Sequence, residues 1–65
     1  MTRTEALDQA RKAAHQAAYL AGEAERHAYG THIHKTTALA AAGALWADTS
    51  RAYAALAQAL PETEA

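Results

Sequence analysis

The sequence predicts an all-α protein: an antiparallel two-helix hairpin that we expect to dimerise into a four-helix bundle. Strong helix formers fill two long stretches, one glycine-centred turn separates them, and a proline closes the second. With 65 residues the chain is one domain at most. We expect a first helix over about residues 3–28, a turn over 29–32, a second helix over about 33–60 and a frayed tail over 61–65.

The boundaries of the first helix have clear signals. Thr2 followed three residues later by Glu5 fits a capping box, in which each side chain satisfies a backbone N–H of the first turn. Between Thr4 and Ala28 there is no proline, and the only glycine is Gly22. The sequence therefore predicts one uninterrupted helix.

The turn and the second helix follow from glycine, threonine and proline. Gly30 suits the left-handed residue that closes a helix, and Thr31 can cap the next one. Stiff β-branched residues lower helix propensity here, so the second helix begins anywhere over residues 33–38. Pro61 disfavours the helical conformation at Leu60 and ends the helix.

The first helix gathers small residues on one side. At 100° per residue, its alanine and leucine residues form a face about 160° wide, opposite a polar face. Such a smooth face lets another helix approach closely. The residues of this face are Ala6, Leu7, Ala10, Ala13, Ala14, Ala17, Ala18, Leu20, Ala21, Ala24 and Ala28.

The second helix carries the large apolar side chains. Some recur at intervals of seven, others flank them, and the remaining circumference is mostly alanine. A helix that is apolar or small nearly all round is usually buried on more than one side. We therefore expect two hairpins to pair through their second helices. The expected dimer or partner interface consists of Leu39, Leu45, Trp46, Tyr53, Leu56 and Leu60.

Composition argues against several classes of function. The net charge is -1 and the six lysines and arginines are spread singly, so we expect no nucleic-acid partner. The longest uncharged apolar run, residues 38–47, is shorter than the roughly 20 residues of a membrane span, and no signal peptide is apparent. We expect a cytoplasmic protein with no membrane partner.

No residue set reaches the standard of an active site. Ser50 has no histidine at helical spacing that could activate it, and it falls on the packed face of its helix. Cysteine is absent, so a thiol nucleophile and thiolate ligands are excluded. We expect no enzyme, no catalytic residues and no cofactor.

Two surface features suggest other functional sites. His27, His32 and His34 lie around the turn, with Glu23 one helical turn before His27, so a histidine-cluster metal site is an alternative to solvated histidines. No standard spacing such as HExxH is present, and our expectation is no metal. Tyr19 projects from the polar face of the first helix and is a candidate surface recognition residue.

The second half of the chain resembles a known group of proteins. Residues 36–65 contain Leu45-Trp46-Ala47-Asp48 at their centre, then Tyr53-Ala-Ala-Leu56 and a closing Ala-Leu-Pro-Glu-Thr-Glu. This stretch resembles small alanine-rich helical-hairpin proteins of unknown function from GC-rich actinomycete genomes and their phages or mobile elements. The resemblance implies no activity.

The function predicted from these features is a non-enzymatic protein–protein interaction module that acts as a homodimeric helical bundle. Scarce large side chains on the first helix and the wide apolar surface of the second favour self-association, since so small a domain buries little surface alone. The first alternative is an accessory subunit of a larger phage or mobile-element assembly, covered by another helical protein. The second is the histidine-cluster metal-binding protein.

Overall fold

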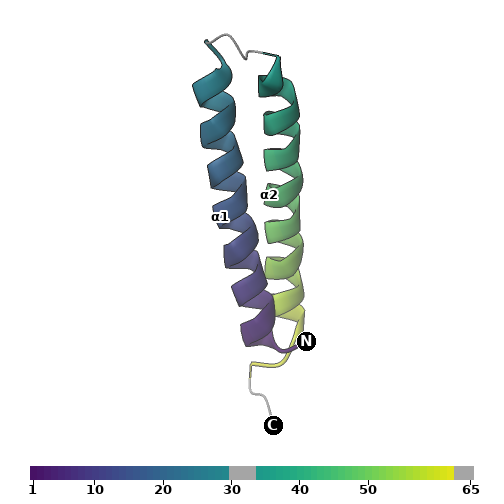
Figure 1. Ribbon diagram of the computed structural model, residues 1–65. Coiled ribbons are helices and arrows are strands. Elements are labelled where there is room, and N and C mark those ends of the chain that lie inside the picture. The colour runs from purple at the N-terminus through teal and green to yellow at the C-terminus, as the bar shows by residue number, and fades with distance from the viewer. Residues whose placement is uncertain (30–33, 63–65) are drawn as a thin grey trace.

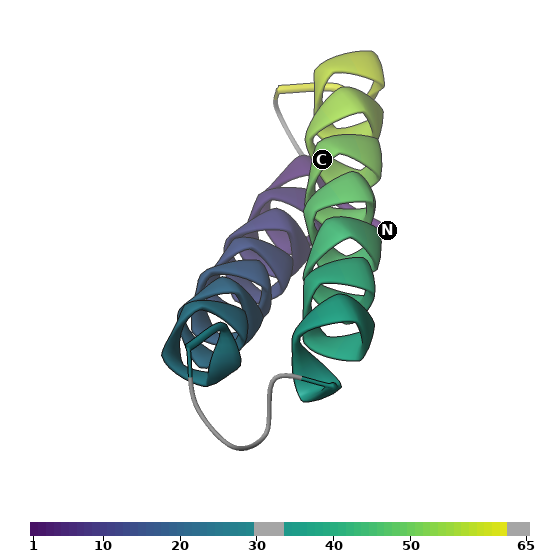
Figure 2. The ribbon, with the colours of Figure 1, turned by 90° about the horizontal axis from the view of Figure 1, so that it is seen from above.

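The computed structural model describes residues 1–29 and 34–62 and forms an antiparallel helical hairpin (Figure 1). Helix α1 spans Arg3–His27 and helix α2 spans Lys35–Ala59, with 25 residues in each. The two helices lie side by side along their whole length (Figures 1 and 2), and the hairpin extends over 54 × 12 × 12 Å. The molecule is thus a two-helix ribbon, in which each helix has one neighbour.

The capping box predicted for α1 is confirmed. The backbone N–H of Thr2 donates to Glu5 Oε1 over 2.9 Å, and the backbone N–H of Glu5 donates to Thr2 Oγ1 over 3.1 Å. These two bonds satisfy donors that the first turn of a helix cannot pair internally. At the other end, the N–H of Ala28 donates to the carbonyl oxygen of Glu25 over 3.2 Å.

Helix α2 begins at Lys35, with His34 in the N-cap position. The glycine and threonine expected to form the turn, Gly30 and Thr31, lie outside the described residues. At its end, Leu60 has the extended conformation (φ -87°, ψ 153°) that is predicted for a residue before proline. Its N–H still donates to the carbonyl oxygens of Leu56 and Ala57, which closes the last turn.

The contact between α1 and α2 consists mainly of small side chains. A Cβ placed on Gly43 would lie 3.5 Å from Leu20 Cβ and 3.6 Å from the carbonyl oxygen of Ala17, so the two backbones come close there. Ser50 Oγ donates to the carbonyl oxygen of Ala10 over 2.8 Å, which confirms that Ser50 lies on the packed face. On α2 the small residues that face α1 recur every seven positions: Thr36, Gly43, Ser50 and Ala57.

The core is correspondingly thin. Among the described residues the buried apolar side chains are all alanine, and no large side chain is fully buried. The alanine face of α1 is also wider than the contact it makes, because Ala14, Ala18 and Ala21 remain exposed. A single neighbouring helix covers only part of a face about 160° wide. The buried residues are Ala6, Ala10, Ala13, Ala24 and Ala57, together with Gly43.

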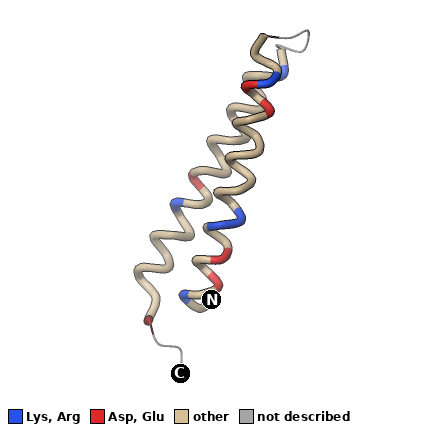
Figure 3. The backbone as a smooth tube through the Cα atoms, turned by 90° about the vertical axis from the view of Figure 1, so that its left-hand side faces the viewer, with Lys and Arg blue, Asp and Glu red and all other residues tan. Residues whose placement is uncertain are grey.

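Charged residues are sparse on α2. Between Lys35 and Asp48 the helix carries no charged side chain, which Figure 3 shows as a long tan segment. Within residues 1–29 and 34–62, neither helix combines the length and the apolar character that crossing a membrane requires.

Candidate interaction surface

An open groove of about 800 Å³ runs between α1 and α2 on one face of the ribbon. Its two walls differ in character. The α1 wall is polar and contains Gln9, Lys12 and Gln16. The α2 wall is formed by three large side chains with little polarity, Leu45, Trp46 and Tyr53, together with Thr49. The groove therefore has one wall that favours contact with water and one that favours contact with apolar groups.

The six residues predicted to form an interface differ in exposure. Leu39, Tyr53 and Leu60 are half-buried beside α1. The other three remain exposed in the hairpin, with exposed fractions of 68% for Leu45, 42% for Trp46 and 40% for Leu56. All six residues lie on α2 or at its C-cap.

Leu45 and Leu56 belong to a continuous row on the outer side of α2, which we call the outer stripe. Successive residues of this row are alternately three and four positions apart, the spacing that places them along one line of an α-helix. At 100° per residue the row lies about 130° around α2 from the residues that face α1. The outer stripe consists of Ala42, Leu45, Thr49, Ala52, Leu56 and Ala59.

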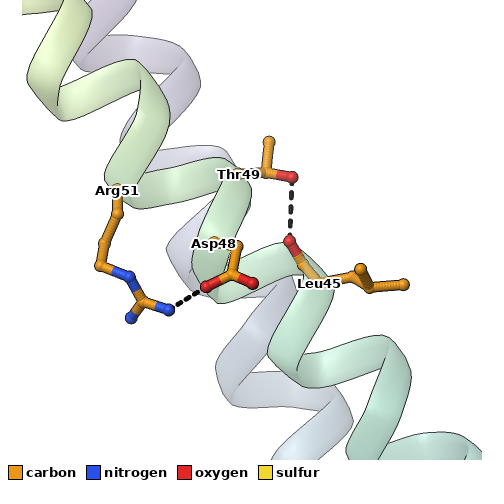
Figure 4. A network of polar contacts seen from close by, with 4 residues as sticks. All are labelled: Leu45, Asp48, Thr49 and Arg51. Atoms are coloured by element: carbon orange, nitrogen blue, oxygen red, sulfur yellow. Dashed lines mark hydrogen bonds and ion pairs between the residues drawn. The ribbon is translucent and has the colours of Figure 1, made fainter.

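The outer stripe carries no charge, and its one hydroxyl is already paired. Thr49 Oγ1 donates to the carbonyl oxygen of Leu45 over 2.9 Å (Figure 4), so this hydroxyl could enter an apolar contact without losing its partner. Asp48 and Arg51 form an ion pair with each other (Figure 4), and Asp48 borders the outer stripe three residues after Leu45.

The other face of the ribbon carries a second open hollow, of about 570 Å³, with a different lining. Only alanine and glycine line it, including Ala18 and Ala21 from α1 and Ala40 and Ala44 from α2. Small side chains provide little apolar area and no chemical group for recognition. This face is consequently a weaker candidate for binding than the groove beside Trp46.

The histidines are placed as follows. Nε2 of His27 lies 3.7 Å from Glu23 Oε2, and Arg26 Nη2 lies 3.4 Å from Glu23 Oε1. His34 occupies the N-cap of α2, while His32 lies outside the described residues. Among the residues that the structure does describe, no three histidine, aspartate or glutamate side chains are grouped so that they could hold a metal ion.

Tyr19 is exposed, with an exposed fraction of 61%, and lies one turn beyond Gln16 without lining the groove itself. Its role in recognition stays a prediction. The polar wall of Gln9, Lys12 and Gln16 had not been predicted as part of a site. The sequence held a usable signal, because these residues alternate by three and four positions on the side of α1 next to its alanine face.

The comparisons with known proteins gave no match: no protein-family model, no curated protein and no solved structure corresponds to this chain. Function is therefore inferred from the geometry of the hairpin and its exposed residues.

Proposed function

We propose that this chain is a non-enzymatic protein interaction module that acts as a homodimer, in which two hairpins pack through their α2 helices into a four-helix bundle. The observation that carries the proposal is the exposure of Leu45, Trp46 and Leu56 together on one uncharged side of α2. Each Å² of apolar surface removed from water contributes about 25 cal/mol, so covering these side chains favours association. Aromatic residues are also enriched at the centres of protein interfaces.

The total exposed area supports the same conclusion. A folded monomer of 6.9 kDa is expected to expose about 4,000 Å². The hairpin exposes 4734 Å², an excess of about 700 Å² over that expectation. A typical stable interface covers about 800 Å² on each partner. One interface of ordinary size would thus bring this chain to the exposed area of a normal globular protein.

Light scattering behind a sizing column tests the proposal on the full chain at micromolar concentration. We expect the wild-type protein to elute with the mass of a dimer. Leu45→Glu should elute as a monomer, because the dimer would have to bury an unpaired carboxylate. Leu45 has an exposed fraction of 68% in the hairpin, so this change should leave the α1–α2 contact and the helicity measured by circular dichroism intact.

A matched control is Ala44→Glu, which places the same charge on an exposed position of α2 that lies away from the outer stripe, one heptad before Arg51. This variant should remain dimeric. The only tryptophan, Trp46, gives a second readout: its emission should shift to the blue in the dimer and to the red in Leu45→Glu. A wild-type chain that is monomeric and fully helical under these conditions would reject self-association and point to a different helical protein as the partner.

A further inference from the structure

We propose that the dimer is antiparallel, with its two-fold axis crossing α2 between Thr49 and Ala52, so that Trp46 of each copy packs against the partner's Tyr53. This inference rests on the proposed homodimer and specifies how its two α2 helices meet. It follows from the outer stripe and from the residues that flank the stripe on either side.

The outer stripe has the spacing of a coiled-coil seam and is nearly the same when read in reverse. Read forward from Ala42 it runs Ala, Leu, Thr, Ala, Leu, Ala, so leucines occupy the second and the fifth places. In a two-fold symmetric contact, residue i touches j while j touches i. An antiparallel seam centred between Thr49 and Ala52 therefore sets Leu45 against the partner's Leu56, with small residues opposite one another elsewhere.

A parallel seam would also place leucine on leucine, so the flanks of the stripe decide between the two directions. On the flank toward α1 lies the seven-residue row of large side chains: Leu39, Trp46, Tyr53 and Leu60. On the other flank lie Ala41, Asp48 and Ala55, all exposed. One flank is thus apolar along its whole length, and the other carries small or charged residues.

Helix direction determines which flanks meet. When two helices pack antiparallel, each flank lies against the same flank of the partner, whereas in a parallel pair each flank lies against the opposite one. The antiparallel pair sets Trp46 against the partner's Tyr53 and Leu39 against the partner's Leu60. The parallel pair would set Trp46 against the partner's Ala41 and Tyr53 against the partner's Asp48, which places a carboxylate beside an aromatic ring.

The antiparallel arrangement also suits the groove between α1 and α2. Trp46 and Tyr53 form part of its wall, and Trp46 is 42% exposed there. In the antiparallel dimer the two grooves lie on the same side of the α2 pair, so the four aromatic rings lie together on that side. The polar residues Gln9, Lys12 and Gln16 then lie at the rim, where interfaces are commonly polar.

Single-cysteine variants test the direction, because the chain contains no cysteine of its own. Ala42→Cys and Ala59→Cys are placed on separate chains, one of which carries a short tag, and the chains are mixed before mild oxidation. In the antiparallel dimer Ala42 faces the partner's Ala59, whereas the two copies of Ala42 are about 26 Å apart along the helices. A disulfide needs Cα atoms within about 7 Å, so the mixture should yield at least about tenfold more cross-linked dimer than either variant alone.

Ala44→Cys mixed with Ala59→Cys is the matched control, because Ala44 lies on the alanine-lined face away from the outer stripe. This mixture should give no more cross-linked dimer than the single variants. Circular dichroism checks that each variant keeps the helicity of the wild type.

The outcomes separate the two proposals. Cross-linking of Ala42→Cys with itself would show a parallel pair and overturn this inference, as would a dimer by light scattering in which the mixture of Ala42→Cys and Ala59→Cys forms no disulfide. A monomer by light scattering would instead overturn the proposed homodimer, whatever the direction of its helices.

Discussion

Thr2 and Glu5 determine where α1 begins, and they also make that end sensitive to acid. The backbone N–H of Thr2 donates to the Glu5 carboxylate, and this bond, followed by a contribution from the Thr2 hydroxyl and the nearby N-terminal charge, holds the pKa of Glu5 below its ordinary value. A carboxyl group whose pKa is lowered by folding stabilises the folded state above its unfolded pKa. That contribution is lost as the pH falls through the lowered value.

Replacing Glu5 with glutamine should flatten this acid dependence. Glutamine can still accept the bond from the Thr2 N–H, but it does not titrate. Between neutral pH and pH values below the ordinary pKa of glutamate, we expect the helicity of the wild type to fall more than that of Glu5→Gln. Circular dichroism at matched concentrations measures the difference, and parallel curves for the two proteins would contradict the assigned cause.

Gly22 has the lowest helix propensity of any residue in α1. A Cβ at this position would meet nothing within 4 Å, so glycine is not required by any neighbour there. Gly22→Ala should raise the free energy of unfolding by about 0.8–1.0 kcal/mol, the difference in helix propensity between the two residues. Ala18→Gly, also exposed on α1, is the reverse control and should lower it by a similar amount. Urea unfolding gives both values.

The pairing of α1 with α2 depends more on the small volume of the side chains between the helices than on their hydrophobicity. Gly43, Ser50 and Ala57 face α1 because their small side chains let the two backbones approach, and the bulky Trp46 and Tyr53 are displaced toward the groove. Close approach lets Ser50 reach the backbone of the other helix, where its hydroxyl bonds the carbonyl oxygen of Ala10. The cost is a core that removes little apolar area from water.

Graded substitution at Gly43 tests this close packing. A methyl group fits, since its contacts of 3.5–3.7 Å are ordinary van der Waals distances, so Gly43→Ala should raise stability through helix propensity. Gly43→Leu should force the helices apart and lower the free energy of unfolding by about 1–3 kcal/mol, as overpacked cores do. Equal stabilities of the two variants in urea unfolding would show that the helices are not in close contact at this position.

The sequence was sufficient to predict the two helices and the signals at their ends, but not which row of α2 residues faces α1. Thr2, Glu5 and Pro61 are local signals, and local rules predicted the capping box and the extended Leu60 correctly. Ser50 was predicted on the packed face, but the row of small residues to which it belongs was not recognised, because a wheel ranked by hydrophobicity gives no weight to Gly43. Their seven-residue spacing was nevertheless present in the sequence.

The residues of the candidate surface were predicted from the sequence, but the sequence did not predict which of them would be half-buried and which would be exposed. Leu39 and Leu45 are equally apolar, and only the position of α1 decides that the first is half-buried and the second is 68% exposed. That position depends on which of two rows of α2 fits the alanine face of α1. Complementarity of shape between two helices is a tertiary property, which the composition of either helix alone does not specify.

If the proposed homodimer is correct, each hairpin gains stability from its partner, because folding is then coupled to association. Two unfolded chains combine to form one folded dimer. Raising the protein concentration therefore favours the folded dimer and raises the unfolding midpoint by mass action. Each tenfold increase in concentration should add about 1.4 kcal/mol per mole of dimer to the free energy of unfolding. A monomer that folds alone gains nothing from concentration.

We therefore expect the thermal midpoint of the wild type to rise steadily with protein concentration, measured by circular dichroism over about a hundredfold range. Leu45→Glu should unfold at a lower temperature that does not change with concentration, because its outer stripe can no longer be covered. Ala44→Glu should follow the wild type. If the wild-type midpoint stayed constant and equal to that of Leu45→Glu, the exposed leucines of α2 would contribute nothing to folding, since no second chain would be covering them.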